Sequence, residues 1–213
     1  MVTGATGYLG RALCSTAQGR SHAVRAFVRP GSEQRAAPGV EVVSGNPFLV
    51  DDVAKALRPG DTLVALIGTP RPNPSKAEQF RRIDLASIEA ATAAARRVGI
   101  AHIVYISVAQ PAPVMKAYIA VRARGEALIR ATGIAATILR PWYVIGPGHR
   151  WPYALVPAYW LLKQFSATRP ASERLGLVTH PQMIAALIDA IERRPDGVRV
   201  IEVPEIRRLG AYA

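Results

Sequence analysis

The 213-residue sequence contains a single cysteine, Cys14, which excludes an intrachain disulfide framework. It has no apolar stretch long enough to span a membrane, because the richest run, residues 151–165, is broken by Pro152 and Pro157. The N-terminus also lacks the charged segment and apolar core of a secretory signal. These absences predict a cytoplasmic protein, most simply a single domain over residues 1–213, with enough apolar residues for a substantial core.

Acidic residues are scarce: 15 Asp and Glu stand against 27 Lys and Arg, for a formal charge of +12. Only four of the basic residues are lysine, and the arginines are spread from Arg11 to Arg208 without a dense stripe interleaved with aromatic residues. This distribution argues against nucleic-acid binding and favours a solvated surface that attracts an anionic cofactor. His149 and His180 are isolated, so no metal site is expected.

Three glycines near the N-terminus, Gly4, Gly7 and Gly10, have the spacing GxxGxxG and are followed by a helical run over residues 11–17. This pattern is typical of a strand-to-helix turn that holds a dinucleotide, with the helix N–H groups facing the pyrophosphate. Gly4 allows a tight turn, Gly7 removes a side chain near the anion, and Gly10 allows close packing of the helix. The candidate cofactor contacts are Thr3, Gly4, Thr6, Gly7, Tyr8, Leu9 and Gly10.

Strand-like apolar runs alternate with helical patterns along the rest of the chain. Strands are predicted at residues 22–28, 40–43, 62–67, 102–107, 136–140 and 198–203. Helices are predicted at residues 50–57, 77–98, 114–131, 155–165 and 181–193. This alternation indicates βαβ crossovers, which place the strands in a parallel sheet covered by helices on both faces.

The octet TGATGYLG, residues 3–10, resembles the glycine loop of the short-chain dehydrogenase/reductase superfamily, especially its extended (epimerase/dehydratase) and atypical branches. The segment LRPWYVIGPG, residues 139–148, is similar to the segment that follows the sixth strand in extended members. The resemblance implies a Rossmann-type α/β fold: a doubly wound parallel sheet with helices on both faces and a small C-terminal cap. The chain departs from the family at its start, because only Met1 and Val2 precede the loop, whereas family members have several apolar residues there that form the first strand. Either the start is trimmed or the first strand is unusually short.

The cofactor is predicted from the end of the second strand. NAD-binding loops place Asp or Glu there, roughly twenty residues after the glycine loop, whereas this chain has Arg29 and no carboxylate before Glu33. A guanidinium favours the 2′-phosphate of NADP, so NADP is predicted and NAD is less favoured; a merely solvated Arg29 is the alternative. Two further candidate contacts are Asn46, where family members commonly have an aspartate contacting adenine, and Gly68, which leaves room for a cofactor ribose.

The resemblance also implies a catalytic Tyr-x-x-x-Lys pair and a serine at the preceding strand end. In the family the tyrosine moves a proton to or from the substrate oxygen, and the lysine holds the nicotinamide ribose. Here Ser107 and Tyr118 are in place, but position 122 is arginine. Residues i and i+4 share a helix face, so Arg122 can set its charge beside the phenol, although guanidinium does not titrate. The alternative makes Tyr118 an ordinary helix residue and Arg122 a surface charge.

The predicted substrate side spans residues 142–180. The resemblance places Pro141, Trp142 and Tyr143 beside the nicotinamide. All three tryptophans lie within residues 142–160, beyond the sixth strand, where open α/β sheets bind ligands. They suggest an aromatic lid over an apolar or aromatic substrate; an aromatic mini-core or peripheral membrane contact are the alternatives.

Two classes of function remain. The first is an NADP-dependent oxidoreductase acting on a small apolar or aromatic carbonyl or quinone-like substrate. The second is a non-catalytic NADP-binding redox sensor, similar to the nitrogen-metabolite-repressor-like members. A nucleotide-sugar epimerase or dehydratase is a further enzymatic alternative, for which the chain is short. Position 122 bears on the choice between these functions. Lysine there would favour an enzyme, whereas Arg122 is also compatible with a non-catalytic sensor.

Overall fold

A computed structural model describes residues 1–146 and 173–211. Its centre is a seven-stranded parallel sheet in the order β3-β2-β1-β4-β5-β6-β9. The strands are β1 (Val2–Thr3), β2 (Arg25–Val28), β3 (Glu41–Ser44), β4 (Thr62–Ala65), β5 (His102–Ile106), β6 (Ala136–Arg140) and β9 (Val198–Glu202). The strand order reverses between β1 and β4, which creates the switch point where open sheets bind ligands.

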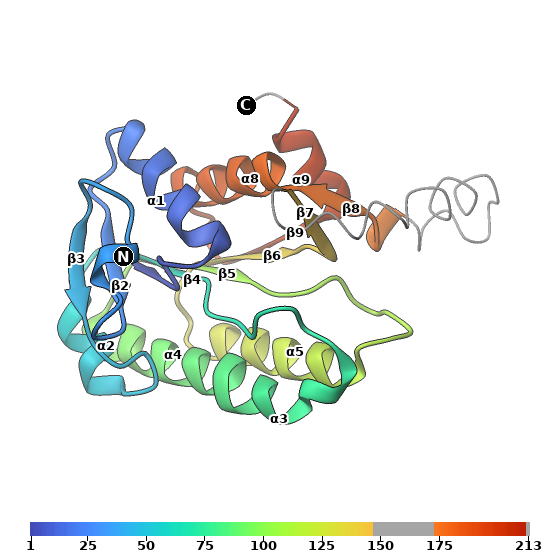
Figure 1. The fold of residues 1–213 in the computed structure, drawn as a ribbon, viewed down its shortest axis with the longest axis horizontal. Helices are drawn as coiled ribbons and strands as arrows, with labels where there is room; N and C mark the ends of the chain where they lie inside the picture. The colour runs from blue at the N-terminus through green and yellow to red at the C-terminus, as the bar shows by residue number, and fades with distance from the viewer. Residues whose placement is uncertain (147–172, 212–213) are drawn as a thin grey trace.

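Helices cover both faces of the sheet, as predicted (Figure 1). On one face lie α1 (Tyr8–Gly19), α8 (His180–Glu192) and α9 (Val203–Leu209). On the other lie α2 (Val50–Ala56), α3 (Ala77–Gln79), α4 (Ala86–Val98) and α5 (Lys116–Arg130). Short 3-10 turns form η1 (Glu33–Arg35) and η2 (Pro74–Lys76), and a π-helical segment, η3 (Phe80–Leu85), joins α3 to α4. The doubly wound arrangement is confirmed.

Each face of the sheet has its own hydrophobic core. Leu13 of α1 and Leu187 of α8 belong to one cluster, and Ile88 of α4 belongs to the other. Strand β5 contributes to both, because Val104 lies in the first cluster and Ile103 in the second. Side chains alternate between the faces of a strand, so a central strand covered on both sides becomes almost continuously apolar.

Element boundaries differ from the sequence prediction in places. The strand predicted from residue 22 begins at Arg25, and the helix predicted from residue 11 begins at Tyr8. β1 has two residues, yet it pairs with β2 through Val2 and Ala26 and with β4 through Val2 and Val64. A two-residue strand therefore takes an interior position in the sheet, between β2 and β4.

Three C-terminal elements were missed. β7 (Tyr143–Ile145) pairs in parallel with β8 (Leu177–Thr179) outside the main sheet, and α9 follows β9 directly. Strands of three residues show no periodicity, and α9 begins within the apolar run read as a strand. The helix predicted at residues 155–165 lies outside the described residues. Within the described ranges, no helix is long and apolar enough to cross a membrane.

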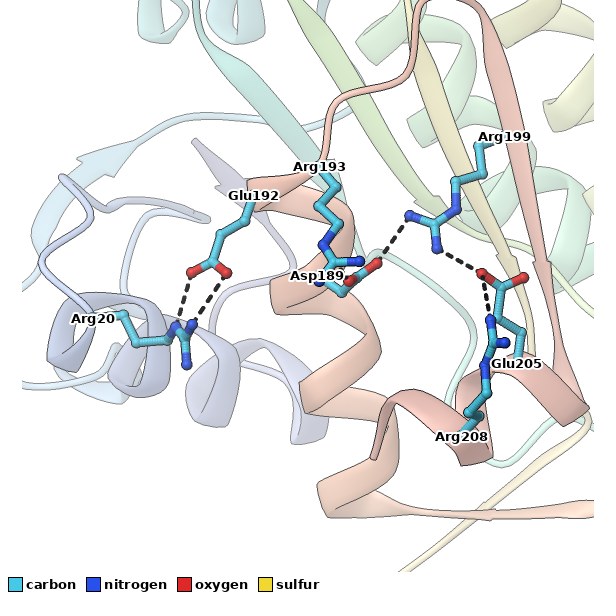
Figure 2. Close-up of polar contacts among 7 residues, drawn as sticks. All are labelled: Arg20, Asp189, Glu192, Arg193, Arg199, Glu205 and Arg208. Atoms are coloured by element: carbon cyan, nitrogen blue, oxygen red, sulfur yellow. Dashed lines mark hydrogen bonds and ion pairs between the residues drawn. The ribbon is translucent and has the colours of Figure 1, made fainter. Parts of the chain in front are cut away.

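Ion pairs tie the C-terminal helices to the rest of the domain. Figure 2 shows Arg20, the residue that follows α1, paired with Glu192 of α8, and the two side chains are 2.8 Å apart. It also shows Arg199 of β9 between Asp189, at 2.9 Å, and Glu205, at 2.6 Å. Surface pairs contribute only about 0–1 kcal/mol each.

Candidate functional site: a cofactor cavity beside two buried charge networks

The glycine loop has the geometry predicted for it. Gly4 has a φ of +74°, and a Cβ there would lie 2.9 Å from the backbone of Leu66. A Cβ on Gly10 would lie 2.2 Å from the carbonyl oxygen of Gly4, so the first turn of α1 packs directly on the loop. Gly7 is the N-cap of α1 and no side chain caps this helix start. The loop therefore presents a helix start without a side-chain cap at the end of β1.

The remaining loop residues have different positions. The buried Thr3 hydroxyl donates to the carbonyl oxygen of Val64, at 3.4 Å, and Leu9 packs against the core. The Tyr8 ring lies 4.5 Å from the ring of His180, between centroids, and His180 Nε2 lies 3.3 Å from the Tyr8 carbonyl oxygen. No pattern in the sequence indicates that His180 contacts this loop. Of the three predicted contacts Thr3, Tyr8 and Leu9, Tyr8 is exposed, Leu9 is half-buried and Thr3 is buried.

A cavity of about 830 Å³ opens beside the loop. It is lined by Gly4, Thr6, Gly7, Phe27, Val28, Arg29, Arg35, Pro47, Phe48, Leu66, Ile67, Gly68, Pro70, Gln79, Arg82 and Ile83. The lining joins the ends of β1, β2 and β4, as expected at the switch point. Three arginines and no acidic residue appear in this described lining. A glycine-backed, apolar and basic cavity suits a dinucleotide that carries phosphate groups.

Glu33 and Asn46 each accept a hydrogen bond from a nearby residue of the chain. Glu33 accepts a hydrogen bond from Ser44 Oγ, at 2.8 Å. Its own backbone N–H and the Ser44 hydroxyl lower the pKa of Glu33. Asn46 Oδ1 accepts from the Phe48 N–H, at 3.0 Å, and Asn46 is not in the cavity lining. Phe48, which the sequence reading did not select, lines the cavity instead.

Arg122 is buried, with 4% of its surface exposed, so the alternative of a surface charge is wrong. Its Nη2 donates to Asp84 Oδ1, at 2.6 Å, and its Nη1 donates to the Ile106 carbonyl oxygen, at 2.9 Å. Burial lowers the pKa of Arg122, but Tyr118, Tyr105 and Asp84 outweigh it and leave that pKa above its ordinary value. The guanidinium therefore faces a buried carboxylate.

Asp84 and Gly68 complete this network. The other carboxylate oxygen of Asp84 accepts from the backbone N–H of Thr69, at 2.9 Å, and from its hydroxyl, at 2.6 Å. A Cβ on Gly68 would lie 2.4 Å from Arg122 Nη2. Gly68 was predicted to leave room for the cofactor; it lines the cavity, and it also makes room for the ion pair.

Tyr118 is half-buried on α5. Its ring lies 4.9 Å from the ring of Phe80, between centroids, and 5.2 Å from Arg122 Cζ. The predicted approach of Arg122 to the phenol ring is thus present. Within the described part of the chain, no side chain or backbone group is hydrogen-bonded to the Tyr118 hydroxyl, which leaves that group available to a ligand.

Ser107 is engaged in a second buried network. Its hydroxyl donates to Glu126 Oε1, at 2.6 Å, and Gln110 Nε2 donates to the same oxygen, at 3.0 Å. Arg140 donates to both oxygens of Glu126, at 2.9 and 2.6 Å. The Ser107 proton is therefore directed at Glu126. Glu126 was not selected from the sequence, although it lies four residues after Arg122 and so on the same face of α5.

The segment after β6 lies only partly within the described residues. The Pro141 carbonyl oxygen accepts from the Ala109 N–H, at 2.9 Å. Trp142 and Tyr143 are half-buried, with ring centroids 5.4 Å apart, and burial raises the pKa of Tyr143. The other aromatic residues of the predicted lid lie outside the described residues. Among those described, no group of three His, Cys, Asp or Glu is arranged to hold a metal ion.

Comparison with known proteins agrees with this geometry. A family model described as NAD(P)H-binding matches residues 4–156. A protein from Caulobacter vibrioides (strain NA1000 / CB15N) named ceramide reductase is 29% identical over 229 residues. The match covers 98% of this chain and 65% of that relative, so the chain spans less than two thirds of the relative's length.

Solved structures show the same fold at low sequence identity. A short-chain dehydrogenase/reductase superfamily protein from Agrobacterium tumefaciens with bound NAD aligns with a TM-score of 0.67 at 16% identity, covering 94% of this chain and 76% of that one. A UDP-N-acetylglucosamine 4-epimerase from Bacillus cereus aligns with a TM-score of 0.68 at 17% identity, covering 94% and 77%. The chain belongs to the NAD(P)H-binding family, and it shares the Rossmann-type fold of these solved structures.

Proposed function

We propose that the protein is an NADP-dependent oxidoreductase that reduces a carbonyl group on an apolar substrate. The observation that carries the choice of cofactor is the cavity beside the glycine loop, lined by Arg29, Arg35 and Arg82 and by no described carboxylate. Arginine binds phosphate through paired, charge-assisted hydrogen bonds. Arg29 and Arg35 would hold the 2′-phosphate, and the first turn of α1 would face the pyrophosphate.

Tyr118 is the proposed proton donor. The chemistry that bound NADPH supplies is hydride donation, which reduces the carbonyl carbon. The Tyr118 hydroxyl gives its proton to the carbonyl oxygen as negative charge develops there, so the product is an alcohol and the phenol is left as phenolate. Arg122, 5.2 Å from the ring centroid, offsets that charge as a fixed cation. The Tyr118 phenolate then takes up a proton from solvent, which restores the phenol.

The substrate class is proposed from the relative and from the chain's own composition. The Caulobacter protein is named a ceramide reductase, which favours a long-chain lipid carbonyl over a nucleotide sugar. The aromatic residues that cluster within residues 142–160 would suit an apolar ligand as well.

A non-catalytic NADP sensor is the second candidate, and a specific observation favours it. The Ser107 hydroxyl donates a hydrogen bond to Glu126, and Arg122 is paired with Asp84. Two of the three positions that the family resemblance makes catalytic are therefore already bonded to other side chains of the protein. A protein built in this way would bind the cofactor without turning it over.

A paired assay separates the two candidates. Calorimetric titration measures NADPH binding, and NADPH oxidation is followed at the same time with long-chain ketones, long-chain aldehydes, ceramides and quinones. The oxidoreductase proposal predicts binding together with substrate-dependent oxidation by at least one of these compounds. Binding without any oxidation supports the sensor, and absence of binding contradicts both.

A further inference from the structure

We propose that Asp84 is a positioning residue that acts through Arg122. The buried pair fixes the Tyr118 ring of α5 against η3 and anchors the backbone at Gly68 and Thr69, and Arg122 serves this interior role instead of binding the cofactor ribose. The catalytic part of this inference rests on the proposed role of Tyr118; the positional part does not.

The carboxylate of Asp84 joins two elements that are distant in sequence. Asp84 belongs to η3, is 1% exposed, and receives hydrogen bonds on both oxygens. One oxygen binds Arg122 of α5, and the other binds the main chain and the hydroxyl of Thr69, in the loop after β4. A buried carboxylate bonded in this way fixes the distance between α5 and the loop that borders the cofactor cavity.

The guanidinium of Arg122 adds the neighbouring strand. Its Nη1 donates to the Ile106 carbonyl oxygen and, more weakly, to the Tyr105 hydroxyl at 3.4 Å. Its Nε is buried and has no hydrogen-bond partner among the described residues. Asp84 is therefore the one carboxylate that neutralises this charge within the described network, and its loss would leave a buried cation uncompensated.

The Tyr118 ring lies against both Phe80 of η3 and Arg122 of α5. The same segment, η3, supplies Phe80, which packs on the Tyr118 ring, and Asp84, which holds the Arg122 guanidinium beside it. Phe80 and Asp84 are four residues apart, so η3 fixes the ring directly and through the ion pair. π-Helical segments often occur at functional sites.

Gly68 connects the pair to the cavity. It lines the cavity, and a side chain there would collide with Arg122 Nη2. Arg122, Tyr118 and Asp84 are absent from the described lining of the cavity. The ion pair thus lies behind the cavity wall, where it can hold Tyr118 without touching a ligand in the cavity.

The test compares Asp84→Asn with Asp61→Asn. Asp61 is a matched control, because it pairs with the buried Arg25 at the opposite end of β4, with side-chain exposures of 18% and 8%. Proteins labelled with 3-fluorotyrosine report the Tyr118 environment by 19F NMR, with the signal assigned by Tyr118→Phe. Thermal unfolding, NADPH titration and steady-state kinetics on the substrate found in the screen complete the comparison.

Both substitutions are expected to lower the melting temperature, because each leaves the charge of a buried arginine without a carboxylate to neutralise it. Asp84→Asn alone should shift the Tyr118 resonance and lower kcat by roughly tenfold or more, with NADPH affinity within about threefold of wild type. An unshifted Tyr118 resonance in folded Asp84→Asn would overturn the inference. A loss of NADPH affinity beyond roughly tenfold would overturn the assignment of Arg122 to the interior.

Arg122→Lys provides a second variant if Asp84→Asn does not fold. It retains the charge but loses the fork that reaches both Asp84 and Ile106, so the Tyr118 resonance should again move while NADPH affinity persists. An unchanged resonance counts against the proposal. If no carbonyl substrate is found, the proposed oxidoreductase activity is contradicted. The Tyr118 resonance still tests whether Asp84 positions the Tyr118 ring, because that measurement needs no substrate.

Discussion

At the scale of single residues, the most consequential position is 122. A buried arginine must be paired with an anion, since an uncompensated charge in the interior costs several kcal/mol. Asp84 meets that need, at 2.6 Å, and the remaining hydrogen bonds reach the end of β5. Position 122 carries arginine where the family resemblance leads one to expect lysine. This arginine lies beside Tyr118 and outside the described lining of the cavity.

The first prediction concerns Tyr118. If it is the proton donor, Tyr118→Phe should lower kcat by about 10²–10⁴-fold, the usual loss on removing a general acid. NADPH affinity should not change, because Tyr118 is absent from the described lining of the cavity. Stopped-flow or steady-state measurement of NADPH oxidation, together with an NADPH titration, checks both statements. Turnover equal to that of the wild type would remove Tyr118 from the mechanism.

The second prediction concerns His102, which is fully buried on β5 with Nε2 3.1 Å from Thr137 Oγ1. Burial, assisted by Arg194, lowers the pKa of His102 from 6.5 to about 4. The unfolded chain therefore binds a proton first as the pH falls, so this group removes stability progressively between pH 6.5 and pH 4. The free energy of unfolding should be about 2 kcal/mol lower at pH 5 than at pH 7.5 from this group alone.

Urea unfolding at the two pH values measures this difference. His102→Gln retains a polar group near Thr137 but does not titrate, so its stability should depend less on pH by the same amount. Equal pH dependence in the two proteins would show that His102 is not the responsible group.

At the scale of elements, the loop between β1 and α1 is built around glycine. The third prediction compares two glycines of α1. A Cβ on Gly10 would meet the Gly4 carbonyl oxygen at 2.2 Å, whereas a Cβ on Gly19 would meet nothing within 4 Å. Gly10→Ala should therefore displace the loop, lowering both thermal stability and NADPH affinity. Gly19→Ala should be neutral, or stabilising by up to about 1 kcal/mol, because it reduces the entropy of the unfolded chain.

Thermal unfolding and NADPH titration of the two variants test this contrast. Similar behaviour of Gly10→Ala and Gly19→Ala would mean that close packing on the loop is not required. Loss of stability without loss of affinity in Gly10→Ala would separate the packing role of this glycine from cofactor binding.

The elements also show how far the sequence could predict the structure. Strands with continuous apolar runs, such as β5 and β6, and the helical stretch over residues 77–98 were predictable because their periodicity is strong. The π-helical segment inside that stretch was not, because the hydrogen-bond register of a helix leaves no simple mark on sequence.

The site was predictable in part, for a similar reason. The glycine loop is local in sequence, and its motif specifies its geometry. The Asp84–Arg122 and Glu126–Arg140 networks join residues far apart in the chain, so no local pattern reveals them. One available signal was missed: Asp84 falls on the buried face of a helix, with Phe80 and Ile88 four residues to either side. A carboxylate in such a position requires a buried partner.

At the scale of the whole molecule, part of the excess positive charge lies where it can attract a phosphate-bearing ligand. Many of the arginines are paired with the few acidic residues, as on α1, α8 and β9. Arg29, Arg35 and Arg82 instead line the cavity of about 830 Å³ beside the glycine loop. A molecule of formal charge +12 will also attract a phosphate-bearing ligand at long range, an effect that salt weakens.

The most direct test of the proposed cofactor is calorimetric titration of NADPH and NADH into the protein and into Arg29→Ala. Arg124→Ala is the matched control, since it removes the same charge from an exposed position on α5 outside the cavity lining. A bidentate arginine–phosphate contact contributes about 1.5–3 kcal/mol, so NADPH should bind roughly ten- to hundredfold more tightly than NADH. Arg29→Ala should narrow that gap while Arg124→Ala preserves it. Equal affinity of the unmodified protein for NADPH and NADH would contradict the account.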